Sequence, residues 1–248
     1  MVNYFICRLK SLINILSIKI KCRKFEKQLP YLYYKNGSQT LVIIFSAFTG
    51  EKRKFNYVKG LRNTNIDRLY ILDPWGYKGS YNLYENGFDS PDLITCKLIN
   101  KVLRGGGYKR VFMAGSSKGG TCAIYFGLKF RAAKIIAGAC QYNLGTYLHR
   151  PDHEKIFISM MGKNAGEDEA YKLNQVLPSC LEAHKGCNSE VHILYSKLEL
   201  TYQRQIVDLL CKLKECNIKT IEIERPFEKH EDVGKYFLPY LLAQIQNE

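Results

Sequence analysis

The sequence predicts a single α/β domain in which a mostly parallel sheet is flanked by helices. Strand-like apolar runs alternate with helix-like amphipathic runs from about residue 30 to the C-terminus. The length of 248 residues suits one substantial core better than two domains. Hydrophobic residues make up 46% and charged residues 24%, as in ordinary globular proteins, which excludes the disordered and collagenous classes.

The first strands are expected to form a hairpin. Residues 31–34 and 40–45 are apolar runs, and Asn-Gly at residues 36–37 has the chemistry of a tight turn between them. The run at residues 68–72 predicts the next strand.

The remaining elements continue the alternation. A helix is expected from Ser90 as N-cap, with Pro91 in its first turn and a glycine stop at residues 105–107. Residues 141–188 are less regular, and an insertion of this kind often covers a site, so we expect a small cap region there. The later expected elements are strand 110–114, helix 121–130, strand 134–140, strand 191–195, helix 202–215, strand 220–224 and a final helix from about residue 232.

Basic residues are in excess, with 37 Lys and Arg against 23 Asp and Glu, a formal net charge of +14. Such a charge favours polyanionic partners such as nucleic acid, anionic glycans, a lipid surface or nucleotide phosphates, unless it is only a solvated lysine-rich surface. Residues 1–29 carry +6 of it, interleaved with apolar residues. We interpret them as a basic amphipathic segment that lies on an anionic membrane, or as a helix packed on the body.

No run approaches the ~20 apolar residues of a membrane-spanning helix, and no signal-peptide pattern is visible. The nine cysteines are odd in number and dispersed, which predicts free thiols in a reducing cytoplasm. Cys180 and Cys187, with His184 between them, lack the second half of a zinc site, so no metal is expected.

One short segment indicates a chemistry. The sequence reads Gly-Ser-Ser-Lys-Gly-Gly at residues 115–120, between a predicted strand and a predicted helix. Gly-x-Ser-x-Gly at such a turn is typical of a nucleophile elbow, where the tight turn exposes the central serine and excludes bulky neighbours. Ser117 is therefore the predicted nucleophile. The glycines also suit close helix–sheet packing, which they would provide in an inactive protein too.

A serine hydroxyl needs a base to take its proton and an acid to orient that base. In this architecture the order along the chain is serine, acid, histidine. His230 follows the strand 220–224 and is the predicted base; Glu199 follows the strand 191–195 and is the predicted acid. Other histidines and acids rank lower: His184, His192, Asp208, Glu224 and Asp232.

The tetrahedral intermediate of acyl transfer also needs backbone N–H donors for its oxyanion. One donor is expected at Lys118, directly after the nucleophile. The other is expected in the loop after the strand 40–45, with Phe48 as first choice and Ala47 as second.

These segments together resemble the α/β-hydrolase-like capsular polysaccharide O-acetyltransferases. The resemblance rests on Phe-Ser-Ala-Phe at residues 45–48, Gly-Ser-Tyr at residues 79–81, the elbow at residues 115–120, and the late acid and histidine. It covers about residues 30–246, and the elbow is its most distinctive part.

The resemblance implies an α/β-hydrolase-like catalytic domain over residues 30–248. It implies acetyl-CoA as co-substrate with no bound cofactor, an acetyl-Ser117 intermediate, and a hydroxyl of a bacterial capsular or surface polysaccharide as acceptor. The chain departs from the pattern at Glu199, where many members carry aspartate, and in residues 1–29, which the pattern lacks.

Several side chains near the expected site are candidates for substrate contact. Basic residues after the oxyanion loop suit coenzyme A phosphates or a phosphodiester glycan, unless they are only a solvated run: Lys52, Arg53 and Lys54. Aromatic rings between the strand and the first long helix offer sugar-stacking faces or internal packing: Trp75, Tyr77, Tyr81 and Tyr84. His149 and His153, in the cap region, are expected to contact substrate.

Two other functions fit the same residues. One is a serine esterase or deacetylase, in which water replaces the sugar; the other is an inactive hydrolase-fold module that binds an anionic glycan. A nucleic-acid partner is not expected, because much of the excess charge lies outside the catalytic domain. We expect a cytoplasmic protein, with peripheral contact to the inner membrane or to capsule-synthesis machinery as a further hypothesis, and leave the oligomeric state open.

Overall fold

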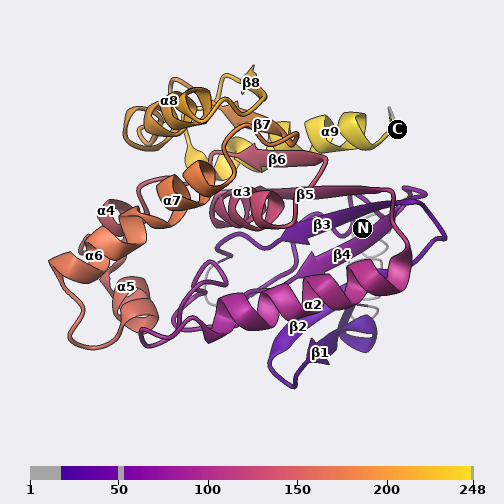
Figure 1. Cartoon of the computed structure of the whole chain (residues 1–248), viewed down its shortest axis with the longest axis horizontal. Coiled ribbons are helices and arrows are strands. Elements are labelled where there is room, and N and C mark those ends of the chain that lie inside the picture. Colours follow the sequence, from indigo (N-terminus) through magenta and orange to yellow (C-terminus); the bar gives the residue numbers. More distant parts are fainter. Residues whose placement is uncertain (1–17, 50–52, 247–248) are drawn as a thin grey trace, which may run out of the picture.

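The computed structural model describes residues 18–49 and 53–246 of the chain. An eight-stranded sheet in the order β1-β2-β4-β3-β5-β6-β7-β8 forms its centre (Figure 1). The six strands β4-β3-β5-β6-β7-β8 run parallel to one another, and β1 and β2 form an antiparallel edge in which β2 pairs with β4. Their bounds are β1 (Arg23–Phe25), β2 (Leu29–Tyr34), β3 (Thr40–Phe45), β4 (Asp67–Ile71), β5 (Arg110–Ser116), β6 (Lys134–Gly138), β7 (Glu190–Tyr195) and β8 (Thr220–Glu224).

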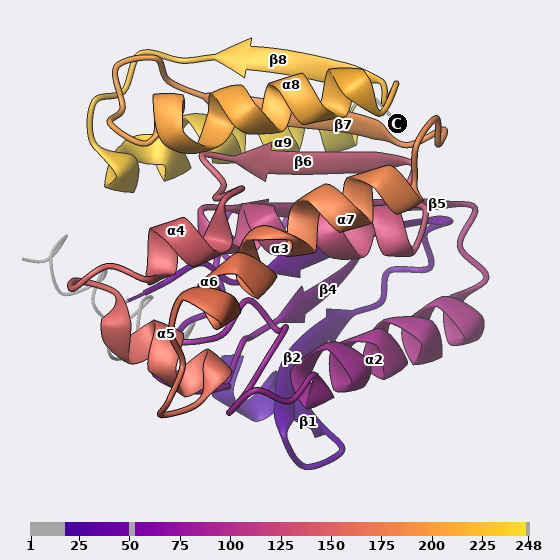
Figure 2. The same cartoon turned by 60° about the vertical axis from the view of Figure 1, so that its left-hand side comes forward.

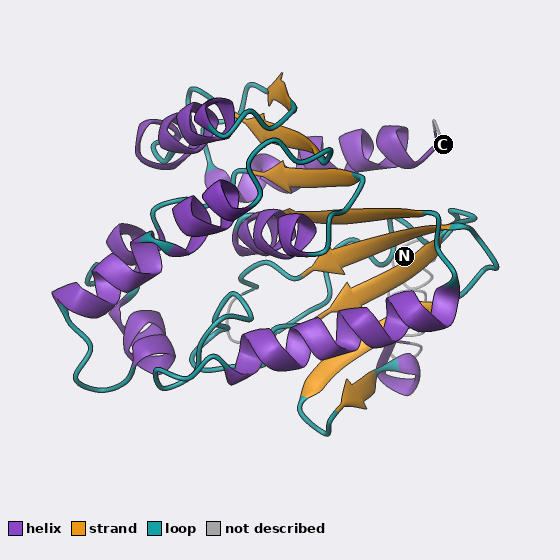
Figure 3. Cartoon of the chain, in the orientation of Figure 1, coloured by secondary structure: helices purple, strands orange, loops and turns teal. Residues whose placement is uncertain are grey.

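Helices cover both faces of this sheet, as the predicted α/β class requires (Figure 3). One face is covered by α2 (Ser90–Gly106), α3 (Lys118–Lys129), α7 (Val176–Ala183) and α8 (Val207–Glu215). The opposite face is covered by α9 (Val233–Gln246) and by the segment 55–66. The prediction of a mostly parallel sheet flanked by helices is confirmed.

The central strands are apolar throughout because both of their faces are covered. Every residue of β3 is buried. Leu41, Ile43 and Phe45 pack into the core under α2 and α3, whereas Val42 and Ile44 pack into the core under α9. This alternation follows from the two-residue repeat of a strand.

The predicted hairpin of residues 31–34 and 40–45 is wrong. β2 pairs with β4 in antiparallel register, and β3 pairs in parallel with β4 and β5, so β4 lies between the two runs. Asn36 holds the connection against the start of β4: its backbone N–H donates to Asp67 Oδ1 at 2.7 Å, and its side-chain amide donates to the Ile66 carbonyl at 3.0 Å. The Asn-Gly turn therefore lies in a connection that passes the start of β4 and joins two strands that are not neighbours, instead of closing a hairpin.

The N-terminal boundary lies earlier than expected. β1 belongs to the sheet although it precedes residue 30, and residues 18–21 form a helical turn before it. The part of the predicted amphipathic segment before residue 18 lies outside the described residues. No helix of residues 18–49 and 53–246 is both long and apolar enough to cross a membrane.

The expected cap region is helical, not irregular. Three short helices lie beyond the carboxyl ends of the strands (Figure 2), namely α4 (Leu144–Leu148), α5 (Glu154–Met161) and α6 (Glu167–Asn174). α7 then leads back onto the sheet. The other expected strands and helices lie within a few residues of their predicted bounds, except that residues 202–206 form a π-helical turn before α8.

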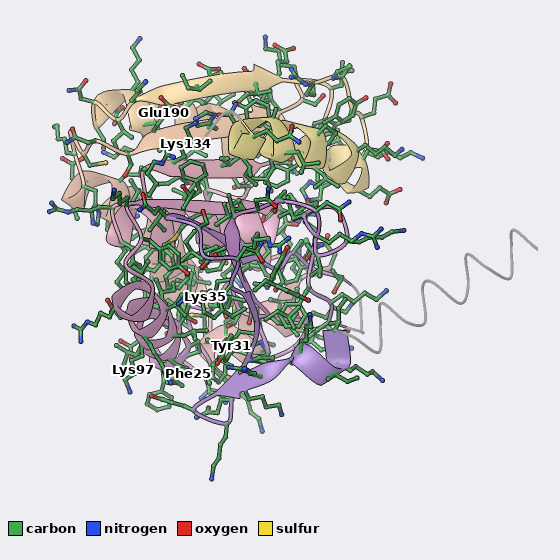
Figure 4. All side chains as sticks on the ribbon, turned by 90° about the vertical axis from the view of Figure 1, so that its right-hand side faces the viewer. Phe25, Tyr31, Lys35, Lys97, Lys134 and Glu190 are labelled. Atoms are coloured by element: carbon green, nitrogen blue, oxygen red, sulfur yellow. The ribbon has the colours of Figure 1, made fainter. Side chains whose placement is uncertain are left out.

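Charged residues begin four of the parallel strands, β4, β5, β6 and β7, at the end of the sheet opposite the cap. Lys134 and Glu190 are register partners at the first positions of β6 and β7, and they lie next to each other in Figure 4. Polar starts and apolar centres keep the ladders of the sheet in a defined register.

Phe237 packs α9 against the face of the sheet that α9 and the segment 55–66 cover. Its fully buried ring packs against the bare backbone of Gly138, and its centroid lies 5.2 Å from that of Tyr57. We expect Phe237→Ala to lower the free energy of unfolding by about 3–5 kcal/mol, measured by urea denaturation. Gln246→Ala, at the exposed last turn of the same helix, is the control and should change it by less than about 0.5 kcal/mol. Equal effects of the two changes would contradict this packing.

Candidate active site

Ser117 occupies a strained turn between β5 and α3. Its φ is 52° and its ψ is −129°, a conformation that non-glycine residues rarely adopt. The turn is fixed on both sides, because the Ser117 N–H donates to the Gly138 carbonyl at 2.7 Å and the Gly120 N–H donates to the Ser117 carbonyl at 2.8 Å. This is the geometry expected of a nucleophile elbow.

The glycines of the elbow allow backbones to touch. A Cβ on Gly119 would lie 2.4 Å from the carbonyl oxygen of Phe45, and a Cβ on Gly115 would lie 2.2 Å from the carbonyl oxygen of Gly119. The start of α3 is therefore pressed against the end of β3, where the loop with Phe48 begins. This contact places the nucleophile and the expected oxyanion loop side by side.

The structure brings the predicted serine, histidine and acid together. His230 Nε2 lies 2.7 Å from Ser117 Oγ, and His230 Nδ1 lies 2.5 Å from Glu199 Oε1. Glu199 is buried and also accepts a hydrogen bond from the Thr201 hydroxyl at 2.6 Å. A carboxylate only accepts hydrogen bonds, so Nδ1 carries the proton and Nε2 is left to accept the Ser117 hydroxyl. The three side chains can therefore act as nucleophile, base and orienting acid.

The expected oxyanion donors differ in how they are used. The Ala47 N–H already donates to Asn56 Oδ1 at 2.9 Å. Within the described part of the chain, the Phe48 N–H donates to no acceptor. Lys118 begins α3, where the first backbone N–H groups of a helix have no partner inside it. Phe48 and Lys118 are therefore the better pair of candidates.

The side chain of Lys118 makes a buried ion pair that the sequence did not indicate. Its Nζ lies 2.6 Å from Asp73 Oδ2, with 1% of the Lys118 side chain and none of the Asp73 side chain exposed. The same carboxylate oxygen accepts the Ser80 N–H at 2.7 Å and the Asn82 N–H at 3.3 Å. Lys118 Nζ also lies 5.4 Å from the centroid of the Phe48 ring. The pair thus connects the elbow, the oxyanion loop and the loop after β4.

A buried amide also reaches the nucleophile. Gln141 Nε2 lies 3.5 Å from Ser117 Oγ, and Gln141 Oε1 accepts the Tyr81 hydroxyl at 3.3 Å. A donor on this side of Oγ favours the serine proton pointing to His230. Sequence reasoning missed Gln141, because a lone glutamine after a strand carries no distinguishing pattern.

The residue before the nucleophile is anchored as well. The Tyr57 hydroxyl lies 2.5 Å from Ser116 Oγ. Burial raises the pKa of Tyr57 to about 12, so the phenol stays protonated and uncharged at neutral pH. This neutral contact fixes the serine that directly precedes Ser117.

Two of the four aromatic residues considered for sugar stacking, Trp75 and Tyr81, do not offer a face. Trp75 is 5% exposed and Tyr81 is fully buried, so the expectation of stacking was wrong for both. Tyr81 instead packs edge-on against Phe48, with ring centroids 5.6 Å apart. The reason is the loop of residues 73–82, which folds inward around Asp73.

The basic residues after the oxyanion loop have different surroundings. Arg53 donates to the backbone carbonyls of Pro74, Trp75 and Gly76, so its guanidinium holds a loop. Lys54 is exposed. Lys52 lies outside the described residues.

A pocket of about 430 Å³ borders Phe48. His153 lies in it, and burial lowers the pKa of this imidazole. Lys78 and Lys155 also line it, with their Nζ atoms 5.1 and 5.9 Å from the Tyr77 ring centroid. The remaining lining residues are Pro151, Asp152, Glu154 and Ile156.

His149, the other cap histidine, is not among the residues that line this pocket. Its ring packs on Phe157 with centroids 4.8 Å apart, and its Nδ1 lies 3.5 Å from Glu167 Oε1. Among residues 18–49 and 53–246, no three His, Cys, Asp or Glu side chains are grouped to hold a metal ion. Cys180 Sγ does lie 3.9 Å from His184 Nδ1, but as an isolated contact.

The parallel sheet, the strained serine turn after β5, and the acid and histidine after β7 and β8 define the α/β-hydrolase fold. No protein-family profile matches the sequence. No curated protein matches it either.

The chain is similar in structure to the capsule O-acetyltransferase of Neisseria meningitidis serogroup A, with a TM-score of 0.75 and 23% identity over 88% of this chain and 91% of that one. A variant of that enzyme has been solved in complex with CoA. A Gap123 glycosylation-associated complex from Streptococcus agalactiae matches at a TM-score of 0.73 and 20% identity, over 89% of this chain and 44% of that one. An S-formylglutathione hydrolase from Agrobacterium tumefaciens matches at a TM-score of 0.61 and 14% identity, over 90% of this chain and 92% of that one.

The buried ion pair yields a stability prediction. Asp73→Asn keeps the shape of the side chain but leaves the Lys118 ammonium unpaired in the interior, so we expect a loss of about 3–5 kcal/mol in the free energy of unfolding. The double variant Asp73→Asn with Lys118→Met removes both charges and should lose less than the sum of the single changes. Urea denaturation measures all three.

The matched control is Asp92→Asn. Asp92 and Lys129 form an ion pair with the same 2.6 Å separation, but 37% of the Lys129 side chain is exposed. Solvent screens the Lys129 charge there, so Asp92→Asn should lower the free energy of unfolding by less than Asp73→Asn does. Additive effects at Asp73 and Lys118, or a larger loss at Asp92, would contradict the role assigned to the buried pair.

Proposed function

We propose that this protein is a serine-dependent O-acetyltransferase. It moves an acetyl group from acetyl-CoA to a hydroxyl of a bacterial capsular or surface polysaccharide. The observation that carries the proposal is the chain of contacts from Ser117 Oγ through His230 to Glu199, at 2.7 and 2.5 Å. The likeness to a capsule O-acetyltransferase supports the choice of donor and acceptor.

In the first half-reaction His230 Nε2 takes the proton of Ser117 as Oγ attacks the thioester carbonyl carbon. Glu199 stabilises the imidazolium that forms. The carbon–sulfur bond then breaks, and coenzyme A leaves as a thiol with the proton that His230 returns. The product is acetyl-Ser117.

In the second half-reaction a sugar hydroxyl gives its proton to His230 and attacks the same carbonyl carbon. The ester bond to Ser117 breaks, Oγ takes the proton from His230, and the acetylated sugar leaves. In both half-reactions the negative charge on the carbonyl oxygen would be held by the N–H groups of Lys118 and Phe48.

The pocket beside Phe48 is the candidate entry for the substrates. Lys78 and Lys155 give it two cations; of its two carboxylates, Asp152 is paired with the Arg150 guanidinium at 2.8 Å, and Glu154 is exposed to solvent. Cations in this position suit the phosphates of coenzyme A or the charges of an anionic glycan. Lys54, exposed near the same loop, stays a weaker candidate.

We place this activity in the cytoplasm. The eight cysteines in the described part of the chain are all free, which is usual in a reducing compartment. Contact of the basic N-terminus with the inner membrane or with capsule-synthesis machinery stays a hypothesis.

The main alternative is an esterase or deacetylase, since the fold also resembles an S-formylglutathione hydrolase. The two functions differ only in which hydroxyl reaches acetyl-Ser117. Acetyl-CoA with and without capsular glycan distinguishes them: we expect release of free coenzyme A to be slow alone and to rise with glycan. Acetate release at full rate without glycan would contradict transfer. Full cellular function of Ser117→Ala would favour the inactive binding module.

The proposed roles predict graded losses of turnover. Ser117→Ala and His230→Ala should each remove measurable acetyl transfer, on the order of 10³-fold or more. Glu199→Ala should leave more residual activity, because it removes the group that orients His230 and not the proton acceptor itself. The rate of free coenzyme A formation is the measurement.

Ser116→Ala is the matched control for the nucleophile. It removes a hydroxyl from the adjacent residue, whose partner is Tyr57 and not His230. Because it removes a positioning contact and not the nucleophile, it should lose far less of the wild-type rate than Ser117→Ala. A loss at Asp208→Ala with none at Glu199→Ala would show that the acid is assigned to the wrong residue.

A further inference from the structure

A second pocket lies on the face of the sheet that the segment 55–66 covers, and its volume is about 270 Å³. Four of its lining residues are cations, two are tyrosines, and no carboxylate is among them. The residues are Ile18, Lys21, Tyr34, Val58, Lys59, Arg62, Arg68 and Tyr70. This composition is that of an anion site.

The pocket is separate from the candidate active site. Arg68 of β4 is the register partner of Val42, which pairs with Phe112 of β5. Ser117 lies five residues further along the chain than Phe112, which corresponds to roughly 17 Å along the strand direction. The proposed acetyl transfer therefore does not use this pocket.

Arg68 is the buried base of the pocket, with 4% of its surface exposed. One of its terminal nitrogens donates to the Leu61 carbonyl and to the Thr64 hydroxyl. Its Nε is buried without a hydrogen-bond partner. An unpaired buried donor costs free energy, and an anion seated in the pocket would satisfy it.

The tyrosine opposite Arg68 orients two of the cations. Tyr34 is the register partner of Arg68 across β2 and β4. The Arg68 guanidinium lies 5.2 Å and the Lys21 Nζ lies 5.0 Å from the centroid of the Tyr34 ring. Burial raises the pKa of Tyr34 and of Tyr70, so both phenols stay protonated and can donate hydrogen bonds.

The other cations at the rim have no neutralising partner. Lys21, Lys59 and Arg62 are exposed, and none of them forms an ion pair with a described residue. Lys59 and Arg62 lie three residues apart in one turn. Like charges gathered around one pocket repel each other, and a bound anion relieves that repulsion.

We propose that this pocket binds a phosphate group, either of a free phosphate or phosphoester or of an anionic lipid headgroup. A phosphate presents several acceptor oxygens, which match the Arg68 guanidinium and the surrounding ammonium groups. The pocket lies next to the helical turn at residues 18–21.

The test measures binding of inorganic phosphate by isothermal titration calorimetry, with chloride at matched ionic strength as the reference. Wild-type protein should bind phosphate saturably. The double variant Lys59→Gln with Arg62→Gln changes only exposed side chains and should weaken the affinity by roughly tenfold. The control Arg104→Gln with Lys109→Gln removes the same charge from another exposed region and should bind as wild type.

Arg68→Met tests the base of the pocket. If this variant folds, it should lose phosphate binding; the rim variant keeps the proposal testable if it does not fold. Absence of saturable binding to wild type, or equal binding by wild type and the rim variant, would overturn the proposal. Ser117→Ala should bind phosphate normally, so failure of this proposal is distinguishable from failure of the proposed enzyme activity.

A second experiment identifies whether the phosphate group belongs to a lipid or to a soluble molecule. Sedimentation with vesicles of phosphatidylcholine alone is compared with vesicles of equal parts phosphatidylcholine and phosphatidylglycerol. If the ligand is a lipid headgroup, the rim variant should lose binding to the anionic vesicles several-fold more than the charge-matched control. Equal loss in the two variants, together with phosphate binding in solution, assigns the pocket to a soluble phosphate or phosphoester.

Discussion

The close approach of two backbones at Gly119 is the constraint on which the candidate site depends. No side chain fits between the start of α3 and the carbonyl of Phe45. Because that contact is direct, the turn at Ser117 lies against the loop that carries Phe48. The strained φ of Ser117 is held by backbone hydrogen bonds from both sides. The positions of the nucleophile and of the expected oxyanion donors are thus two results of one packing contact.

The Lys118–Asp73 pair extends this constraint to the loop after β4. The carboxylate is shared between the ammonium and two backbone N–H groups, which ties that loop to the elbow. Burying two charges is costly, and hydrophobic replacement is often as stable. We therefore infer that the pair serves to position the loop after β4 against the elbow. Gln141 and Tyr57 fix the neighbouring serines in the same region, so little of the site is left to side-chain freedom.

Site residues could be predicted from the sequence where a short motif or a position after a strand marks them, and not where only a partner distant in the chain does. Ser117, His230 and Glu199 were identifiable because each follows directly from a motif or from its place after a strand, and the structure brings them into contact. Asp73 was missed because its partner is 45 residues away and an aspartate before proline has no distinctive pattern. The hairpin at residues 36–37 was predicted wrongly because turn chemistry does not reveal that β4 inserts between the two strands.

In the proposed reaction Ser117 carries the acetyl group between donor and acceptor. Peptide mass spectrometry of the protein quenched in acid after brief exposure to acetyl-CoA tests it most directly. We expect one added acetyl group on Ser117 in wild-type protein and in Ser116→Ala, none in Ser117→Ala, and loss of that group when glycan is added before the quench. Acetylation at another residue with Ser117 unmodified, or an equal acetyl adduct in Ser117→Ala, would contradict it.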